Sequence, residues 1–306
     1  MIQQRSIKTS IRATGLGLHS GSKVLLTLRP APPNTGIVFR RVDLSPCVEI
    51  LAKPENVLET ELATSLGKGE HRISTVEHLM SAFAGLGIDN CVVEVDRAEV
   101  PVMDGSAAPF VFLLQSAGVV DQGAAKRFIR ITKPVEVELG DKWARVSPHQ
   151  GFKLDFSIDF DHPAVRATKQ SLQFDFANAS FVKEISRART FGFMRDFELL
   201  REKGLARGAS MENAVALDAD RVMNDEGLRY SDEFVRHKAL DAIGDLYMMG
   251  HCMLAKLEAH KAGHHLNNLL AREVMQRTDC WEWQTFEGEA KEASPFAVGG
   301  ADLIFA

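Results

Sequence analysis

The same order of predicted elements occurs twice along this chain of 306 residues, and this repeat is the strongest constraint on its fold. Each copy reads as a helix, a strand, a turn and a second helix. The first copy spans residues 74–117 and the second spans residues 232–277. Few residues match between the copies; the matches include Val76-x-His78 and Val235-x-His237. The repeat is therefore one of pattern, and it predicts two units of like topology.

Short alternating segments are typical of β-strands, and they surround both copies. In the first half, turns rich in glycine and proline separate them, so we expect a largely antiparallel sheet there. The expected strands are residues 2–11, 23–29, 36–41 and 90–96 in the first half, and 128–131, 135–139, 144–146, 152–160 and 173–176 in the second. Residues 186–193 fit either a strand or an extended loop.

Together these elements predict an α+β fold with two domains of similar topology, residues 1–125 and 126–306. The helices would be sandwiched between two sheets. Each domain carries an insert, and the insert of the second domain spans residues 198–222. Equivalent helices could then meet at the seam between the domains, where pockets tend to form.

The composition is that of a soluble globular protein, with 45% hydrophobic and 25% charged residues. No apolar run approaches the roughly 20 residues of a membrane helix, and no secretory signal is evident, so we expect no integral membrane segment and a cytoplasmic location. A net charge of −5 with dispersed basic residues argues against nucleic-acid binding. The four cysteines form no Cys-x-x-Cys pair, which argues against a cysteine-type zinc site. We expect a monomer.

The helix predicted over residues 234–246 carries the first candidate site residues. His237 and Asp241 lie one turn apart, so their Cβ atoms would be about 5–6 Å from each other. Asp245 continues the same row. An imidazole and a carboxylate at this spacing can hold a divalent metal, although such a pair is more often a solvated or hydrogen-bonded surface pair.

A second helix, predicted to begin near residue 74, carries Glu77 and His78. Ser74 and Glu77 have the spacing of a capping box, which would place both candidates in the first turn. If this helix meets the one described above, two imidazoles and one carboxylate could hold Zn²⁺ or Fe²⁺ with an open position. Such an ion lowers the pKa of a bound water to about 7, and Glu77 could take its proton. Capping alone would also explain Glu77, and His78 could be a core histidine.

Two further residues have side chains suited to amide hydrolysis. His264 lies in a predicted glycine turn, where it could point into a cleft and protonate a leaving amine; a polar surface turn is the alternative. The hydroxyl of Thr190 could stabilise an oxyanion, although threonine is common in strands without such a role. These residues by themselves indicate a candidate metal-dependent hydrolase without defining its substrate.

Six separated motifs extend this interpretation to nearly the whole chain. They are Gly15-Leu16-Gly17-Leu18-His19-Ser20-Gly21, Ser74-Thr75-Val76-Glu77-His78-Leu79, Pro101-Val102-Met103-Asp104-Gly105-Ser106, Arg187-Ala188-Arg189-Thr190-Phe191-Gly192, His237-Lys238-x-x-Asp241-x-x-Gly244-Asp245 and Gly263-His264-x-x-Asn267. In this order the motifs resemble those of the UDP-3-O-acyl-N-acetylglucosamine deacetylases of Gram-negative lipid A biosynthesis. Six motifs in order are far more specific than any one of them.

The resemblance implies two α+β domains with a single Zn²⁺ at their interface, Fe²⁺ being the alternative metal. It also implies hydrolysis of the acetamide at C2 of a UDP-linked, 3-O-hydroxyacylated N-acetylglucosamine, which releases acetate and is the committed step of lipid A biosynthesis. The implied metal ligands are His78, His237 and Asp241. The implied catalytic residues are Glu77 as general base, His264 as general acid, Asp245 as the residue that orients His264, and Thr190 as oxyanion donor.

The same resemblance suggests how the substrate is held. Lys238 would contact the substrate, and Phe191 would lie near the mouth of an acyl-chain passage formed by residues 198–222; an ordinary amphipathic cover is the alternative for this insert. Weaker candidates for the nucleotide side are Phe160, Lys261 and His19. An aromatic face can stack on uracil and an ammonium group can meet pyrophosphate.

Two other functions remain open from the sequence. One is a non-catalytic acyl-sugar or nucleotide-binding module in which the metal only ties two domains together. The other is a related hydrolase that acts on a different acyl-sugar.

Overall fold

The computed structural model describes residues 1–286. Its first half forms a five-stranded sheet from β2 (Ile11–Leu16), β3 (Lys23–Pro30), β4 (Ile37–Arg41), β5 (Val48–Leu51) and β9 (Cys91–Val95). The strand order is β2-β3-β9-β4-β5. Alternation of buried and exposed residues along β3 shows that one face of this sheet packs on the core.

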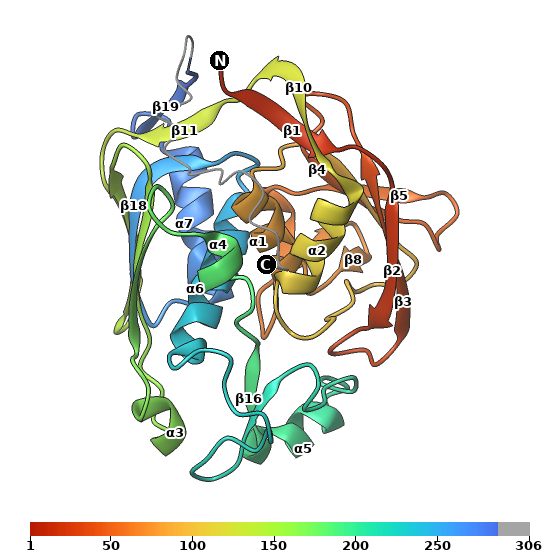
Figure 1. Cartoon of the computed structure of the whole chain (residues 1–306), viewed down its shortest axis with the longest axis vertical. Coiled ribbons are helices and arrows are strands. Elements are labelled where there is room, and N and C mark those ends of the chain that lie inside the picture. The colour runs from red at the N-terminus through yellow and green to blue at the C-terminus, as the bar shows by residue number, and fades with distance from the viewer. Residues whose placement is uncertain (287–306) are drawn as a thin grey trace.

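The second half forms a seven-stranded sheet around β18 (Met253–His260). The other strands are β11 (Phe128–Ile131), β12 (Val135–Leu139), β13 (Lys142–Pro148), β14 (Phe152–Ser157), β15 (Ser171–Asp175) and β19 (Trp281–Gln284). In Figure 1 the two sheets lie on opposite sides of a layer of helices. The predicted α+β fold, with helices between two sheets, is confirmed.

The two sheets share one topology around their central strands. In the first, β9 lies between antiparallel β3 and parallel β4. In the second, β18 lies between antiparallel β13 and parallel β14. The outer strands β2, β5, β12 and β15 each run antiparallel to their neighbours. The predicted likeness of the halves is therefore confirmed, although the parallel β4–β9 pair makes the first sheet mixed.

The domain boundary near residue 125 stays a prediction. It coincides with the end of β10 (Val119–Ala125), which pairs with β1 (Gln3–Ile7) in a separate two-stranded sheet. The end of the predicted second domain, residues 287–306, lies outside the described residues.

Four helices fill the space between the sheets: α1 (Glu77–Leu86), α2 (Ala108–Ala117), α6 (Glu233–Tyr247) and α7 (His264–Gln276). The contact between α1 and α6 depends on Gly244. A Cβ added there would lie 2.0 Å from the Glu77 carbonyl oxygen and 3.0 Å from the Ser81 nitrogen. Only glycine permits this approach, which places the first turn of α1 against the C-terminal part of α6.

Each half carries an additional small sheet. The first half has a 3-10 turn η1 (Pro54–Asn56) followed by β6 (Val57–Glu59), β7 (Ser65–Lys68) and β8 (His71–Ile73). The second half has β16 (Phe191–Phe193), α5 (Met194–Glu202) and β17 (Val215–Leu217), with β16 parallel to β17. The short helices α3 (Pro163–Arg166) and α4 (Phe181–Glu184) complete the described elements. No helix within residues 1–286 has the length and apolar character needed to cross a bilayer.

Three predicted boundaries are wrong, the first two because tertiary hydrogen bonds intervene. The strand expected over residues 2–11 is divided into β1 and β2, since the N–H groups of Lys8 and Thr9 bond to the end of α2. The predicted capping box is absent: α1 begins at Glu77 without a side-chain cap, and the hydroxyl of Ser74 accepts a bond from Ser65. His264 is the first residue of α7, with Gly263 as its N-cap, and does not lie in a turn.

Candidate metal and catalytic site

His78, His237 and Asp241 converge where α1 meets α6. Their ligand atoms all lie within 4.8 Å of one another, and all three side chains are buried. Asp241 Oδ1 lies 3.5 Å from His78 Nε2 and 3.3 Å from His237 Nε2. The structure thus brings together three residues that are up to 163 positions apart in the sequence, as predicted for a ligand set.

The donor set fits a divalent cation. Asp241 Oδ1 is buried and makes no hydrogen bond within the described residues, an arrangement that is costly without a bound partner. The His237 Nδ1–H donates to the Ala188 carbonyl at 3.0 Å, which directs the lone pair of Nε2 towards the other two ligands. Two imidazoles and a carboxylate are ligands that suit zinc or iron.

The protonation states also fit ligands. Burial lowers the pKa of His237 to about 3, so this imidazole is neutral and able to coordinate at neutral pH. Burial opposes ionisation of Asp241, but neighbouring charges hold its pKa well below the usual range. Lys238 contributes to this effect, since its Nζ lies 2.8 Å from Asp241 Oδ2.

Glu77 lies beside this group of ligands at the start of α1. Its Oε2 accepts a hydrogen bond of 3.0 Å from the Thr64 backbone N–H. Burial raises the pKa of Glu77, which makes its carboxylate a better proton acceptor than an exposed glutamate. Since Glu77 caps no helix, the capping explanation for this residue no longer holds.

The His264 ring is held in place by Asp245. Its Nδ1 lies 2.9 Å from Asp245 Oδ2, which also accepts a bond of 2.9 Å from Asn267 Nδ2. The Thr64 hydroxyl donates to Asp245 Oδ1 at 2.6 Å. Burial opposes protonation of His264, but Asp245 outweighs it and raises the pKa of His264 to about 9. At neutral pH the imidazole is therefore an acid ready to give up a proton.

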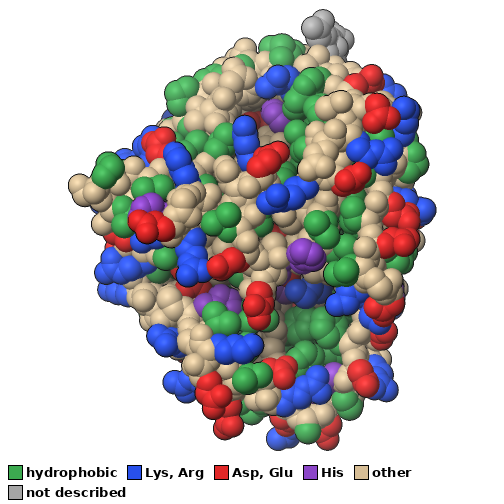
Figure 2. All heavy atoms as spheres, turned by 180° about the vertical axis from the view of Figure 1, so that it is seen from behind, with side chains coloured by type: hydrophobic (Ala, Val, Ile, Leu, Met, Phe, Trp, Pro, Cys, Tyr) green, Lys and Arg blue, Asp and Glu red, His purple; other side chains and the backbone are tan. Residues whose placement is uncertain are grey.

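A cavity of about 380 Å³ opens over these groups. The predicted site residues that line it are Glu77, His78, Phe160, Thr190, Phe191, His237, Lys238, Asp241, Lys261 and His264. A volume of this size lies within the range of about 300–1,000 Å³ that is usual for small-molecule sites. The face shown in Figure 2 is hollowed, with hydrophobic side chains inside the hollow and histidine and basic side chains at its edge.

Thr190 reaches the cavity from a segment that is fixed on both sides. Its backbone N–H donates to the Gly105 carbonyl, and its own carbonyl accepts from Val215, both at 2.8 Å. The preceding residue, Arg189, is only 1% exposed and pairs with Glu233 at the start of α6, with Nε 2.9 Å from Oε1. The segment around Thr190 is thus held from both halves of the chain. Its partners are the Pro101–Ser106 motif in the first half and α6 in the second.

Four of the five predicted substrate residues line the cavity. Lys238 Nζ lies 5.9 Å from the centre of the Phe191 ring. Phe160 packs edge-on against Phe191, with ring centres 5.2 Å apart. Lys261 Nζ is paired with Asp141 and Asp159, at 2.7 and 2.8 Å. His19 does not line the cavity; both of its ring nitrogens are buried and make no hydrogen bond within the described residues.

Two residues of this site were not predicted to act in it. Asn267 follows His264 by three positions in α7, so a helix beginning at residue 264 would have placed both on one face. Thr64 gives no such local signal, because its partners Glu77 and Asp245 are 13 and 181 residues away.

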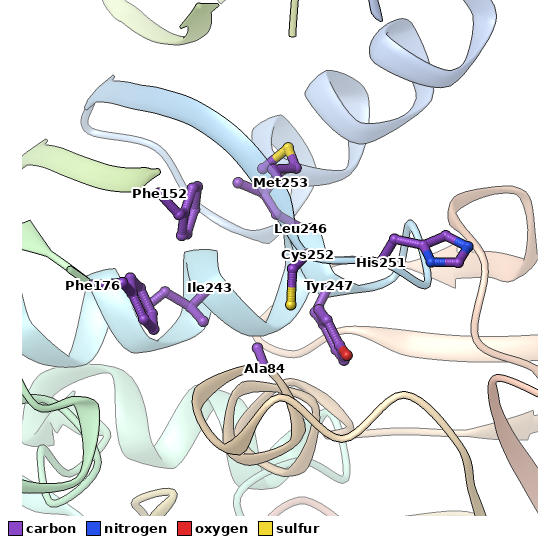
Figure 3. A pocket seen from close by; sticks show the side chains of 9 residues that line it. All are labelled: Ala84, Phe152, Phe176, Ile243, Leu246, Tyr247, His251, Cys252 and Met253. Atoms are coloured by element: carbon purple, nitrogen blue, oxygen red, sulfur yellow. The ribbon is translucent and has the colours of Figure 1, made fainter. Parts of the chain in front are cut away.

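A second, much smaller hollow lies between α6 and the seven-stranded sheet, where apolar side chains pack incompletely. Figure 3 shows that its lining is mostly apolar, with Phe152, Phe176 and Ile243 directed towards it and His251 directed away. The hydroxyl of Tyr247 is already bonded to the Ile88 carbonyl at 2.8 Å. No group there is arranged for chemistry.

Comparisons with known proteins identify the family of the chain. Residues 4–276 match the model of the LpxC family, described as UDP-3-O-acyl N-acetylglycosamine deacetylase. A protein of Thioalkalivibrio sulfidiphilus named UDP-3-O-acyl-N-acetylglucosamine deacetylase is 60% identical over 96% of each chain. Proteins of the same name from Methylococcus capsulatus and Cellvibrio japonicus are 61% and 60% identical over 94% of this chain and 95% of theirs. The chain therefore belongs to the family of UDP-3-O-acyl-N-acetylglucosamine deacetylases.

Proposed function

We propose that the chain hydrolyses the acetamide of UDP-3-O-(3-hydroxyacyl)-N-acetylglucosamine with Zn²⁺ held by His78, His237 and Asp241. As a member of its family the chain is a metal-dependent deacetylase of lipid A biosynthesis. The identity of the metal, the details of the substrate and the roles of individual residues belong to the proposal. Fe²⁺ suits the same ligands and is the alternative ion.

One observation carries the proposal: a proton acceptor and a proton donor face the same buried group of ligands. The pKa of Glu77 is raised by burial, and that of His264 is raised to about 9 by Asp245. Amide hydrolysis needs both functions, since the attacking water must lose a proton and the leaving amine must gain one. A protein that only binds its ligand does not require a proton acceptor and a proton donor beside the metal ligands.

When bound, a divalent cation supplies Lewis acidity that favours ionisation of water and polarises the carbonyl group. In the proposed reaction Glu77 takes the proton from the attacking water through the oxygen that Thr64 does not hold. The hydroxyl of Thr190 donates to the carbonyl oxygen as negative charge develops on it. His264 then gives its Nε2 proton to the nitrogen at C2 while the C–N bond breaks, and Asp245 stabilises the ring through Nδ1.

The rest of the cavity is proposed to hold the remaining parts of the substrate. Lys238 is placed to contact the sugar, and Phe191 lies where β16 leads into the insert that would receive the acyl chain. We assign Phe160 and Lys261 to the nucleotide side; His19, the third candidate for that side, does not line the cavity. Because Lys261 is already paired with two carboxylates, it would have to exchange a partner to meet pyrophosphate.

We also propose that the protein acts in the cytoplasm as a monomer. All four cysteines are free, which suits a reducing compartment.

The test of this function is acetate release by Glu77→Ala and Glu77→Gln variants. Both should fold and keep their metal, because Glu77 is not a ligand, yet kcat should fall about 10²–10⁴-fold for loss of an acid–base group. Glu70→Ala, which removes an exposed glutamate, is the matched control and should keep full activity. Undiminished activity of the Glu77 variants, or wild-type activity that survives complete metal removal, would contradict the proposal.

A further inference from the structure

Thr64 contacts both carboxylates that act at the proposed site. It lies between β6 and β7 and is 2% exposed. Its backbone N–H donates to Glu77 Oε2 at 3.0 Å, and its hydroxyl donates to Asp245 Oδ1 at 2.6 Å. One residue of the first half therefore bonds both to the proposed general base and, across the seam, to the carboxylate that holds the proposed general acid.

The hydroxyl completes the hydrogen bonding of Asp245. Asp245 Oδ2 accepts from His264 and from Asn267, each at 2.9 Å, while Oδ1 accepts from Thr64. An ionised carboxylate can only accept, so the Thr64 hydroxyl must be the donor. Because both oxygens have donors, rotation of the carboxylate would break bonds on both sides. The orientation of Oδ2 towards His264 is thereby fixed.

The backbone N–H of Thr64 likewise fixes the orientation of the Glu77 carboxylate. With Oε2 held by the Thr64 N–H, the other carboxylate oxygen of Glu77 is left to accept a proton. Two residues of the same connecting segment, Thr60 and Leu62, line the cavity. Leu62 adopts a left-handed conformation, with φ of 63°, which is uncommon for a residue other than glycine.

We propose that Thr64 is a positioning residue that sets the relative placement of the general base and the general acid. Its hydroxyl acts through Asp245 on the His264 ring, and its N–H acts directly on Glu77. This inference rests on the proposed hydrolysis and assigns a role to a residue that touches neither the metal ligands nor the proton that is transferred.

Thr64→Val and Thr64→Ser test the hydroxyl separately from the backbone. Valine has nearly the same shape as threonine without the donor, whereas serine keeps the donor. For Thr64→Val we expect kcat to fall about 10–100-fold, the usual effect of losing a hydrogen bond that orients a functional group, with KM and metal content within about twofold of wild type. Thr64→Ser should restore most of the lost kcat. Should the valine variant not fold, Thr64→Ala removes the same donor without added bulk and carries the same expectation.

Thr27→Val is the matched control, because it makes the same change at a buried threonine of β3. Its kcat should equal that of wild type. If Thr64 acts through His264, Thr64→Val should cost less than about threefold in kcat in a His264→Ala background, since residues acting as a unit are not additive.

The outcomes separate the two proposals. Acetate release by wild type together with a Thr64→Val kcat within threefold of it would overturn this inference alone. Equal losses in the wild-type and His264→Ala backgrounds would also overturn it, because they indicate a general structural effect. Absence of metal-dependent acetate release by wild type would overturn the proposed function and the inference with it.

Discussion

His264 keeps its proton at the N-terminal end of a helix, where the macrodipole ordinarily disfavours a cation. It is the first residue of α7, and the dipole effect there is worth about 0.3–1 kcal/mol. Asp245 opposes it with a charge-assisted hydrogen bond of 2.9 Å, an interaction typically worth about 1.5–3 kcal/mol. The carboxylate outweighs both the burial of the ring and the dipole, and the pKa of His264 rises to about 9.

This pairing predicts the pH dependence of the reaction. Wild-type kcat should show an alkaline limb near pH 9, and Asp245→Asn should move that limb towards pH 6.5 and reduce kcat at pH 8 by at least about tenfold, since one pKa unit changes the protonated fraction up to tenfold. The measurement is kcat against pH by acetate release. Asp279→Asn, at an exposed carboxylate, is the control. An alkaline limb that stays in place in Asp245→Asn would show that Asp245 does not charge His264.

Protonation of His264 also stabilises the folded state, and this stabilisation decreases as the pH rises. The folded pKa of His264 lies above the ordinary value of 6.5, so the folded state binds the proton more tightly. The stabilisation is complete below about pH 6.5 and is lost as the pH rises through about 9. Asp245→Asn should therefore lower the free energy of unfolding more at pH 6 than at pH 10.

At the residue scale, chemistry and motifs predicted the three residues that converge at the candidate metal site better than they predicted the residues around them. His237 and Asp241 share a helix face, and His78 stands in a motif, so each leaves a trace in the sequence. Thr64 leaves none: its bond to Asp245 spans 181 positions and depends on how two helices are arranged in space.

At the scale of elements, the site depends on how closely α1 approaches α6. Glycine inside a helix costs about 1 kcal/mol relative to alanine, yet Gly244 stands within α6, three residues before its last residue. The cost is offset because the backbone of α1, at Glu77, occupies the space that a side chain would need. This contact sets the separation between His78 on one helix and His237 and Asp241 on the other.

Gly244→Ala should therefore destabilise the protein although it improves helix propensity. The added Cβ would lie 2.0 Å from the Glu77 carbonyl oxygen, so the helices must separate, and overpacking of this kind costs about 1–3 kcal/mol. We expect a lower Tm and weaker metal binding, measured by calorimetry and by competition with a chelating dye. Gly192→Ala, where no atom lies within 4 Å of the new Cβ, is the control. Unchanged metal affinity in Gly244→Ala would show that this contact does not set the ligand geometry.

The elements themselves were more predictable than their ends. Apolar periodicity located α6, and α2 matched its predicted range within one residue. The start of α1 was placed wrongly because Ser74 bonds to Ser65, a partner outside the helix. Local sequence reports the preference of a segment for a helix, whereas tertiary hydrogen bonds decide where the helix begins.

At the scale of the whole molecule, two units of like topology share one hydrophobic core. A single cluster of buried residues includes Phe39 and Phe83 of the first half together with Phe156 and Phe234 of the second. The repeat of predicted elements indicated this arrangement, including a layer of helices between the two sheets. The domain boundary near residue 125 remains our proposal for how the two units divide.

The central claim is that two histidines on different helices and one aspartate hold a catalytic zinc ion at this seam. Anomalous scattering at the zinc edge, from crystals of the purified chain, tests it most directly. We predict one strong peak at about 2.0–2.2 Å from His78 Nε2, His237 Nε2 and a carboxylate oxygen of Asp241. A zinc peak bound elsewhere, or no peak between these three side chains in active protein, would contradict the account.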